Sequence, residues 1–292
     1  MSLRIALAQF PITGPERLEQ FWHKVDAILG DAASGGAALA VLPEYACMET
    51  AACFPGAGSP TAELAAVSAI AADLLQGFRD AARRHRIWLL PGTLPWRSGG
   101  RVLNRAPLIA PDGRLAWQEK SIMTRFEAES WGVCSGGAPR VFTTEFGRIG
   151  IAICYDVEFP ALVHAQAAAG AWLILAPSCT DSLHGFNRVR LSARARALEN
   201  QCFVAVAPTV GNAPHLASVD ENHGYAAVFG PVDRGFPDDG VIVRGALDEA
   251  GLVFADLDPH KLEAVRNDGA VRNFRDWPDN PPACADTVLE VA

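Results

Sequence analysis

The sequence predicts an α/β fold, because strand-like and helix-like segments alternate along the chain. Short apolar runs with the length of buried strands occur at residues 4–9, 38–42, 88–93, 104–109, 148–154, 172–176 and 203–207. Helix-like segments lie between several of these runs. This alternation is typical of a sheet whose faces are covered by helices.

Four segments carry the helical signals. Residues 17–32 have an apolar stripe at helical spacing, formed by Leu18, Phe21, Trp22, Val25, Ile28 and Leu29. Residues 61–85 are rich in Ala and Leu and end in three basic residues, which favours a helix C-terminus because the helix dipole is negative there. Residues 159–169 and 187–201 are the other two expected helices.

Composition excludes several classes of function. The chain has 292 residues and a formal net charge of −8, with no block of basic residues, so nucleic-acid binding is not expected. No apolar stretch reaches the ~18 residues of a membrane span, and the N-terminus has the pattern of a first strand and not of a signal peptide. The seven cysteines form no CxxC pair, which argues against a disulfide framework and a zinc site. A reducing cytoplasm is therefore the expected compartment.

A single domain is expected over residues 1–270. The Pro- and Gly-rich stretches at 53–60, 134–139 and 230–240 are short enough to be loops within that domain, and no low-complexity linker separates two halves. Residues 271–292 are rich in Pro and Asp. We expect this tail to pack on the domain or on a partner subunit.

Cys154 ends an apolar run and is followed at once by polar residues and a helix signal. A strand that delivers a thiol at its carboxyl end is a common way to present a nucleophile, since sites in α/β sheets lie at that edge. The local pattern alone leaves a second interpretation open, in which Cys154 is inert and packed, because free cysteine is among the most buried residue types.

Two other strand ends carry residues of matching chemistry. Glu44 follows an apolar run and a proline, and Lys120 follows the short strand-like segment 113–118. Taken singly, each residue has a second interpretation: Glu44 as a helix-starting or surface acid, and Lys120 as an ordinary solvated lysine. Three reactive residue types at three strand ends indicate one site more readily than three coincidences.

With these motifs in their order, the chain resembles the nitrilase superfamily, the carbon–nitrogen hydrolases that use a Glu-Lys-Cys triad, and its amidase-like branch in particular. The resemblance is carried by Pro43-Glu44-Tyr45, Glu119-Lys120, Cys154-Tyr155-Asp156, Phe159-Pro160 and the Arg-rich segment 194–201. It implies a single-domain, four-layer α-β-β-α sandwich. It also implies a homodimer or higher homo-oligomer paired through helices 159–169 and 187–201, and it implies no metal or organic cofactor.

The implied activity is hydrolysis of a small carboxamide or carbamoyl compound to acid and ammonia through an acyl thioester on Cys154. Glu44 is the expected general base, and Lys120 is expected to stabilise the oxyanion together with the backbone N–H of Tyr155. Lys120 is also expected to lower the pKa of Cys154. Nitrile hydrolysis is the nearest alternative; acyl transfer and non-catalytic binding are the others.

The family also carries a second glutamate in the loop after the lysine. Glu127, seven residues after Lys120, matches it best, and Glu129 is the alternative. This residue is expected to hold the lysine and to position the substrate.

The residues around the nucleophile bear on the substrate. Cys154-Tyr155-Asp156 is the amidase-like form, whereas true nitrilases usually have Cys-Trp-Glu. Glu158 stands where ω-amidases often have an Arg suited to a substrate carboxylate. If Glu158 faces the pocket, a neutral or cationic amide is favoured; if it pairs with a neighbouring arginine, that inference does not hold.

Further pocket residues are expected at the end of the strand after the nucleophile helix, namely Ser178, Cys179 and Thr180, with Cys179 as a packing residue and not a second nucleophile. The charged residues of segment 194–201 are expected to be structural, paired with one another or with neighbours. The loop at 232–240 has two interpretations, a lid over the pocket or an edge that contacts another subunit.

Overall fold

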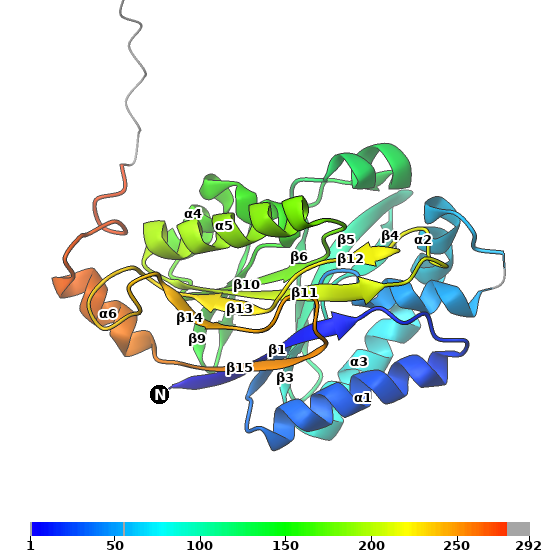
Figure 1. Cartoon of the computed structure of the whole chain (residues 1–292), viewed down its shortest axis with the longest axis horizontal. Helices are drawn as coiled ribbons and strands as arrows, with labels where there is room; N and C mark the ends of the chain where they lie inside the picture. The colour runs from blue at the N-terminus through cyan, green and yellow to red at the C-terminus, as the bar shows by residue number, and fades with distance from the viewer. Residues whose placement is uncertain (1, 55, 279–292) are drawn as a thin grey trace, which may run out of the picture.

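The strands form one curled 15-stranded sheet whose two halves lie face to face, as the computed structural model shows for residues 2–54 and 56–278 (Figure 1). The halves are joined where β1 (Leu3–Pro11) and β11 (Phe203–Asn212) pair in parallel, Phe10 with Thr209 and Pro11 with Val210. Helices cover the outer faces. This is the four-layer α-β-β-α sandwich that the resemblance implied.

The first half contains β1 and seven further strands: β2 (Leu39–Val41), β3 (Trp88–Leu90), β4 (Leu94–Ser98), β5 (Arg101–Ile109), β6 (Leu115–Glu119), β7 (Val133–Cys134) and β15 (Gly251–Leu257). The second half contains β8 (Val141–Thr144), β9 (Gly147–Ile151), β10 (Leu173–Ser178), β11, β13 (Ala227–Phe229) and β14 (Val241–Arg244). The short β12 (Glu221–Asn222) pairs with the end of β11.

The described residues also form six α-helices: α1 (Leu18–Ser34), α2 (Pro60–Ala69), α3 (Ala71–His85), α4 (Pro160–Ala168), α5 (Leu183–Asn200) and α6 (Pro259–Asp268). In Figure 1, α1 and α3 lie on one side of the sandwich and α4 and α5 on the other. None of the helices within the described residues has the length and apolar character that crossing a membrane requires.

Strand β1 is buried on both faces, which explains its continuous apolar run. Ile5 and Leu7 belong to a core shared with strands of the second half, whereas Ala6 and Phe10 belong to the core beneath α1 and α3. Alternate residues of a strand point to opposite faces, so one strand contributes to two cores.

Several element boundaries differ from the sequence prediction. The helix expected at 61–85 is two helices, α2 and α3, with Ile70 between them outside helical geometry at φ −104° and ψ 8°. Helix α5 begins at Leu183, because the Ser182 side chain caps it by accepting a hydrogen bond from the Gly185 N–H. Strands β4, β7, β8 and β12–β15 and helix α6 were not predicted. Most of these strands are too short to show a clear period.

The described part of the C-terminal segment packs on its own domain. The Trp277 ring stacks on His164 of α4 with centroids 4.0 Å apart, and the Phe274 N–H donates to the Gln201 side chain. Residues 279–292 lie outside the described residues, so the domain boundary at 270 stays a prediction. The six described cysteines are all free thiols.

The loop between β13 and β14 packs against this same region. Phe236 lies against Phe203 of β11, and the Asp233 carboxylate accepts a hydrogen bond from the Ala270 N–H. The loop at 232–240 therefore braces the start of the C-terminal segment.

Gly92 fixes the backbone just before Glu44. It has φ +78°, and a Cβ placed on it would lie 1.7 Å from the Pro43 carbonyl oxygen. Gly100 has the same φ of +78° and nothing within 4 Å of such a Cβ. Comparing alanine substitutions at Gly92 and Gly100 therefore separates the cost of a left-handed backbone from the cost of a steric clash with Pro43.

We therefore predict that Gly100→Ala lowers the free energy of unfolding by about 1 kcal/mol, the usual effect of a side chain in the left-handed region. Gly92→Ala is expected to lower it by about 3 kcal/mol or more and to reduce activity, because Pro43 must move and Glu44 follows it. Denaturant unfolding of the two variants tests this. Equal losses of stability would contradict the close approach of Gly92 to Pro43.

Candidate active site

Three of the four predicted catalytic side chains lie at the carboxyl ends of strands on one edge of the sandwich. Glu44 follows β2, Lys120 follows β6 directly, and Cys154 follows β9 and starts the 3₁₀ helix Cys154–Glu158. Glu127 comes from the π-helix Phe126–Trp131. Because these elements are far apart in sequence, the cluster is made by the sheet topology and not by local structure.

Lys120 is the centre of this cluster. Its Nζ donates to Glu44 Oε1 at 2.8 Å and to Glu127 Oε2 at 2.5 Å. Lys120, Glu44 and Glu127 are 1%, 1% and 3% exposed. An ammonium removed from water to this extent needs opposite charge and hydrogen bonds, and the two carboxylates supply both.

Glu127 is held more completely than Glu44. Its Oε2 accepts hydrogen bonds from the Thr124 N–H at 3.0 Å and hydroxyl at 2.9 Å, and its Oε1 accepts from the Tyr45 hydroxyl at 2.9 Å and from Asn104 Nδ2 at 3.1 Å. Thr124, Tyr45 and Asn104 were not predicted as site residues. Their signal in the sequence is weak: Tyr45 is part of the Pro43-Glu44-Tyr45 motif, and Asn104 is one of several polar residues in β5.

The structure thus places Glu127, and not Glu129, beside Lys120. Glu129 pairs with Arg125 on the exposed side of the same π-helix, with Nε to Oε1 at 3.0 Å. The two glutamates are two residues apart in the chain, so they lie on different sides of the π-helix, Glu127 on the buried side and Glu129 on the exposed side.

The environments of the two glutamates push their pKa values apart. Burial raises the pKa of Glu44 to about 7, against the opposing pull of the Lys120 ammonium. Burial acts in the same direction on Glu127, but Lys120 and the hydrogen bonds from Thr124 and Tyr45 outweigh it and lower the pKa of that carboxyl. The two carboxylates also outweigh burial at Lys120 and hold its pKa well above the usual range. Glu44 is therefore the carboxylate able to take up a proton near neutral pH.

Cys154 is a buried thiol in a constrained backbone. It has φ +47°, in the left-handed region that non-glycine residues seldom occupy. Burial and the neighbouring Glu44 raise its pKa well above the usual value, and the opposing effect of Lys120 is smaller. Lys120 lowers the pKa of Cys154, as expected, but desolvation of the thiolate outweighs this effect and the net pKa is raised. The thiol needs a base to become a nucleophile.

Backbone groups tie the cluster together. The second oxygen of Glu44 accepts a hydrogen bond from the Cys179 N–H at 3.2 Å, and the Cys154 thiol donates to the Cys179 carbonyl at 3.6 Å. The Asp156 carboxylate accepts from the N–H groups of Ser121 and Ile122 at 3.1 and 2.9 Å. Asp156 thus connects the turn that carries the nucleophile to the segment after Lys120.

These residues open into a cavity of about 630 Å³. Of the predicted pocket residues, Tyr155, Glu158, Cys179 and Thr180 line it. Ser178 does not, because it is the buried last residue of β10 and its hydroxyl donates to the Ala176 carbonyl. Residues not predicted from the sequence also line the cavity, namely Tyr45, Thr124, Arg125, Phe126, Trp131, Asp181, Gly185, Arg188, Val189 and 217–221. Residues 232–240 contribute nothing to the lining, so the structure gives no support to a lid there.

Glu158 lines the cavity, but its carboxylate is paired with an arginine. Its Oε1 lies 3.5 Å from Nε of Arg188 on α5. Arg196 of the same helix pairs with Glu199 through its Nε at 2.9 Å and also donates to the carbonyls of Val157 and Glu158. Arg196 therefore braces the end of the nucleophile turn, in line with the structural role expected of segment 194–201.

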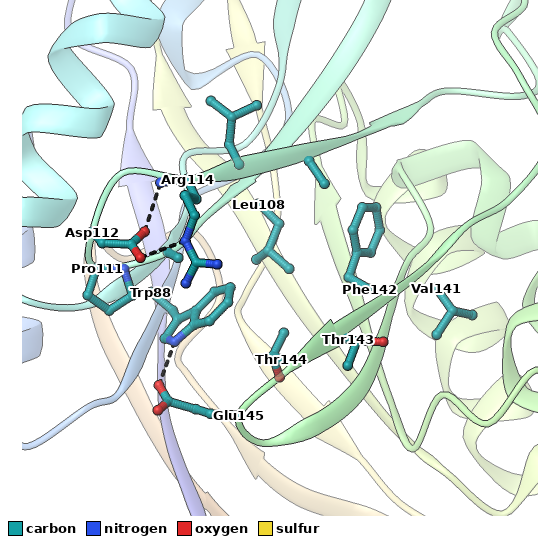
Figure 2. A pocket seen from close by; sticks show the side chains of 13 residues that line it. Trp88, Leu108, Pro111, Asp112, Arg114, Val141, Phe142, Thr143, Thr144 and Glu145 are labelled. Atoms are coloured by element: carbon teal, nitrogen blue, oxygen red, sulfur yellow. Dashed lines mark hydrogen bonds and ion pairs between the residues drawn. The ribbon is translucent and has the colours of Figure 1, made fainter.

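A second hollow of about 610 Å³ lies between the turn at Asp112 and strand β8 (Figure 2). Its charged side chains are engaged: Trp88 Nε1 donates to Glu145 at 2.7 Å, and Arg114 pairs with Asp112. None of the predicted catalytic residues lines this hollow. The chemistry is therefore assigned to the cavity at Cys154.

Fold and site together define a hydrolase of carbon–nitrogen bonds, and the comparisons agree. The chain belongs to the carbon-nitrogen hydrolase family, whose model matches residues 4–267. It is 31% identical to the probable hydrolase YhcX of Bacillus subtilis, over 94% of this chain and 53% of YhcX, so it spans about half of that protein. A deaminated glutathione amidase of Synechocystis sp. is 29% identical over 89% of this chain and 93% of its own. The crystal structure of an amidase from Nesterenkonia sp. is 26% identical, with a TM-score of 0.71 over 91% and 94% of the two chains.

The elevated pKa of Glu44 predicts a pH dependence. A base must be ionised to act, and a carboxyl with a pKa of about 7 is ionised only above that pH. We expect kcat/KM to fall as pH drops through about 7, and not near the ~4.3 of an ordinary glutamate. A pH profile of kcat/KM checks this. A rate that stays constant down to about pH 5 would assign the base role elsewhere.

Proposed function

We propose that this protein is an amidase that hydrolyses a small carboxamide or carbamoyl compound to the acid and ammonia through an acyl thioester on Cys154. The observation that carries the proposal is the buried Lys120 ammonium shared by Glu44 and Glu127, in a cavity that the Cys154 thiol also lines. The cluster supplies a nucleophile, a base and a cation at one place.

In the first half-reaction, Glu44 takes the proton of the Cys154 thiol and the sulfur attacks the amide carbon. Negative charge moves to the amide oxygen, where the Lys120 ammonium and the Tyr155 N–H stabilise it. Glu44 then returns the proton to the departing nitrogen, the C–N bond breaks and ammonia leaves. The acyl group remains bound to sulfur as a thioester.

In the second half-reaction, Glu44 takes a proton from a water molecule that attacks the thioester carbon. The C–S bond breaks, the proton passes to the sulfur, and the acid is released with Cys154 restored. One glutamate serves both steps because its pKa of about 7 lets it accept and return a proton at neutral pH. Glu127, with a lowered pKa, stays ionised and holds Lys120.

The relatives support this chemistry. One has the name deaminated glutathione amidase. In one structure of the Nesterenkonia amidase, a Glu-to-Gln variant carries the acetamide moiety of fluoroacetamide covalently at its active-site cysteine. A covalent adduct on Cys154 is the corresponding expectation for this chain.

We predict that Cys154→Ala removes all turnover and leaves the stability nearly unchanged, since it deletes only a sulfur atom from a buried wall. Ammonia release and intact mass, followed over a panel of amides, carbamoyl amines and nitriles, test the proposal. A transient acyl adduct in the parent protein, absent in Cys154→Ala, is expected with an amide or carbamoyl compound.

The same assay separates the alternatives. Acid from a nitrile but not from the matching amide would favour a nitrilase. An adduct released only to an added amine would favour acyl transfer. Neither an adduct nor ammonia from any compound would favour a binding role. Retained hydrolysis in Cys154→Ala would exclude the thioester.

The charges of the cavity bear on the substrate. Its three cationic residues are each paired with carboxylates: Lys120 with two, Arg125 with Glu129 and Arg188 with Glu158. Asp181, Asp220 and Glu221 also line it. A substrate carboxylate would therefore enter an acidic cavity whose cations are already engaged, so we propose a substrate that lacks an anionic group.

We predict that a neutral amide is turned over with a kcat/KM at least ~10-fold above that of its carboxylate-bearing analogue of equal length, which corresponds to about 1.4 kcal/mol. Matched pairs of amides that differ only in a terminal carboxylate or methyl group measure this. Arg188→Gln, which frees Glu158, is expected to widen the difference. Preference for the anionic member would contradict the proposed selectivity.

Assembly and compartment stay predictions. The proposed homodimer would bring together the exposed faces of α4 and α5, which carry Ala161, Ala165, Ala168, Leu191 and Leu198. The cytoplasm is the proposed compartment.

A further inference from the structure

Asn104 is a buried amide that contacts both glutamates of the site. It lies within β5 and is 1% exposed. Its Nδ2 donates to Glu44 Oε1 at 2.8 Å and to Glu127 Oε1 at 3.1 Å. One NH₂ group has two hydrogens, so both are used, one on each carboxylate.

The orientation of this amide is fixed by electrostatics. The Asn104 Oδ1 has no hydrogen-bond partner within the described residues. If the amide were rotated by 180°, Oδ1 would still gain no hydrogen-bond donor. It would also lie against two carboxylate oxygens, which only accept hydrogen bonds. The protein thus leaves one acceptor unsatisfied in order to aim both donors at the glutamates.

Asn104 is also tied to Lys120 through the backbone. The Lys120 N–H donates to the Asn104 carbonyl at 2.9 Å, directly after the paired residues Arg105 and Glu119 of β5 and β6. The amide and the ammonium therefore hold fixed places on adjacent strands. Each of them contacts both Glu44 and Glu127, so the four side chains form a closed ring.

We propose that Asn104 is a positioning residue of the hydrolytic reaction, whose side-chain amide holds the base Glu44 and the lysine-binding Glu127 at fixed places around Lys120 and favours the ionised form of both. It does not line the cavity, so it acts through the two glutamates and not on the substrate. The inference rests on the proposed function only in treating Glu44 as the base that activates Cys154.

The effect of Asn104 on the pKa of Glu44 can be separated from that of the other groups around Glu44, because a substitution at Asn104 leaves those groups unchanged. Titratable groups near it come from several elements: Tyr45 beside it, Lys120 after β6, Glu127 in the π-helix, Cys154 after β9 and Cys179 after β10. Replacing Asn104 by Leu keeps the size of the side chain and changes none of them. The loss of a donor to the carboxylate must then raise the pKa of Glu44, because hydrogen bonds to the charged form favour that form.

A measurement on the thiol itself tests this without a known substrate. Iodoacetamide alkylates Cys154 when Glu44 takes its proton; a C–S bond forms, the C–I bond breaks and iodide leaves. The rate is followed by the mass of the peptide that contains Cys154, with Cys154→Ala to identify that peptide. For Asn104→Leu we expect the rate–pH curve to move upward by ~1 pH unit, with a ~10-fold lower rate at pH 6 and an unchanged or higher plateau in base.

Two further variants keep the test sharp. Asn200→Leu removes another fully buried amide, on α5, whose Nδ2 donates to the Arg196 carbonyl and touches neither glutamate. It is expected to lose stability without moving the rate–pH curve. Asn104→Asp is the second variant at the site. It replaces the donor by an acceptor and is expected to move the curve further upward than Leu does.

A curve of unchanged midpoint in both Asn104 variants, or one lowered equally at every pH, would overturn the proposal, because a merely structural role acts on all protonation states alike. If Asn104→Leu does not fold, the Asp variant decides by the same criterion. An unreactive parent Cys154 at every pH would instead refute Glu44 and Cys154 as base and nucleophile, and with them the proposed function. The two failures are thus distinguishable.

Discussion

The structure of the site depends on one buried ammonium. Lys120 is removed from water and bonded to Glu44 and Glu127, and each of the three would be unfavourable in that position alone. Asn104, Tyr45 and Thr124 donate further hydrogen bonds to these two carboxylates. Burial penalises the ionised form of both glutamates and raises the pKa of Glu44 to about 7, whereas Lys120 and the hydrogen bonds to Glu127 outweigh burial there and keep that carboxylate ionised.

The topology of the sandwich holds those charges at one edge of the sheet. Strands β2, β6, β9 and β10 all end there, and the backbone of the residue after β10 bonds both Glu44 and Cys154. Close packing fixes the approach of these strands, as at Gly92, where no side chain fits beside Pro43. The left-handed backbone of Cys154 belongs to the same arrangement, because it turns the chain from β9 into the short helix that presents the thiol. The fold thus stores local strain at the nucleophile and compensates for it elsewhere.

Different charged residues of the cavity bear on the type of reaction and on the choice of substrate. The inner cluster of Lys120, Glu44, Glu127 and Cys154 matches hydrolysis of a carbon–nitrogen bond and does not depend on what the acyl group carries. The outer wall differs, since Arg125 and Arg188 are paired and Asp181, Asp220 and Glu221 are acidic. The proposed chemistry and the proposed selectivity therefore rest on different elements, the strand ends in one case and the other residues that line the cavity in the other.

The sequence by itself determined the α/β alternation and placed Glu44, Lys120 and Cys154 after strands, and the resemblance added Glu127 to the same site. The alternation and the strand positions follow from apolar runs, which are local properties of the chain, whereas Glu127 was implied by the resemblance to the family. Tertiary structure decided the rest. Glu158 pairs with Arg188 and Ser178 turns away from the cavity because of which strands and helices become neighbours. The direction of the Cys154 pKa shift was likewise hidden, since desolvation depends on everything that surrounds the thiol. The role of Asn104 was not visible in the sequence, because its partners are 60 and 23 residues away in the chain.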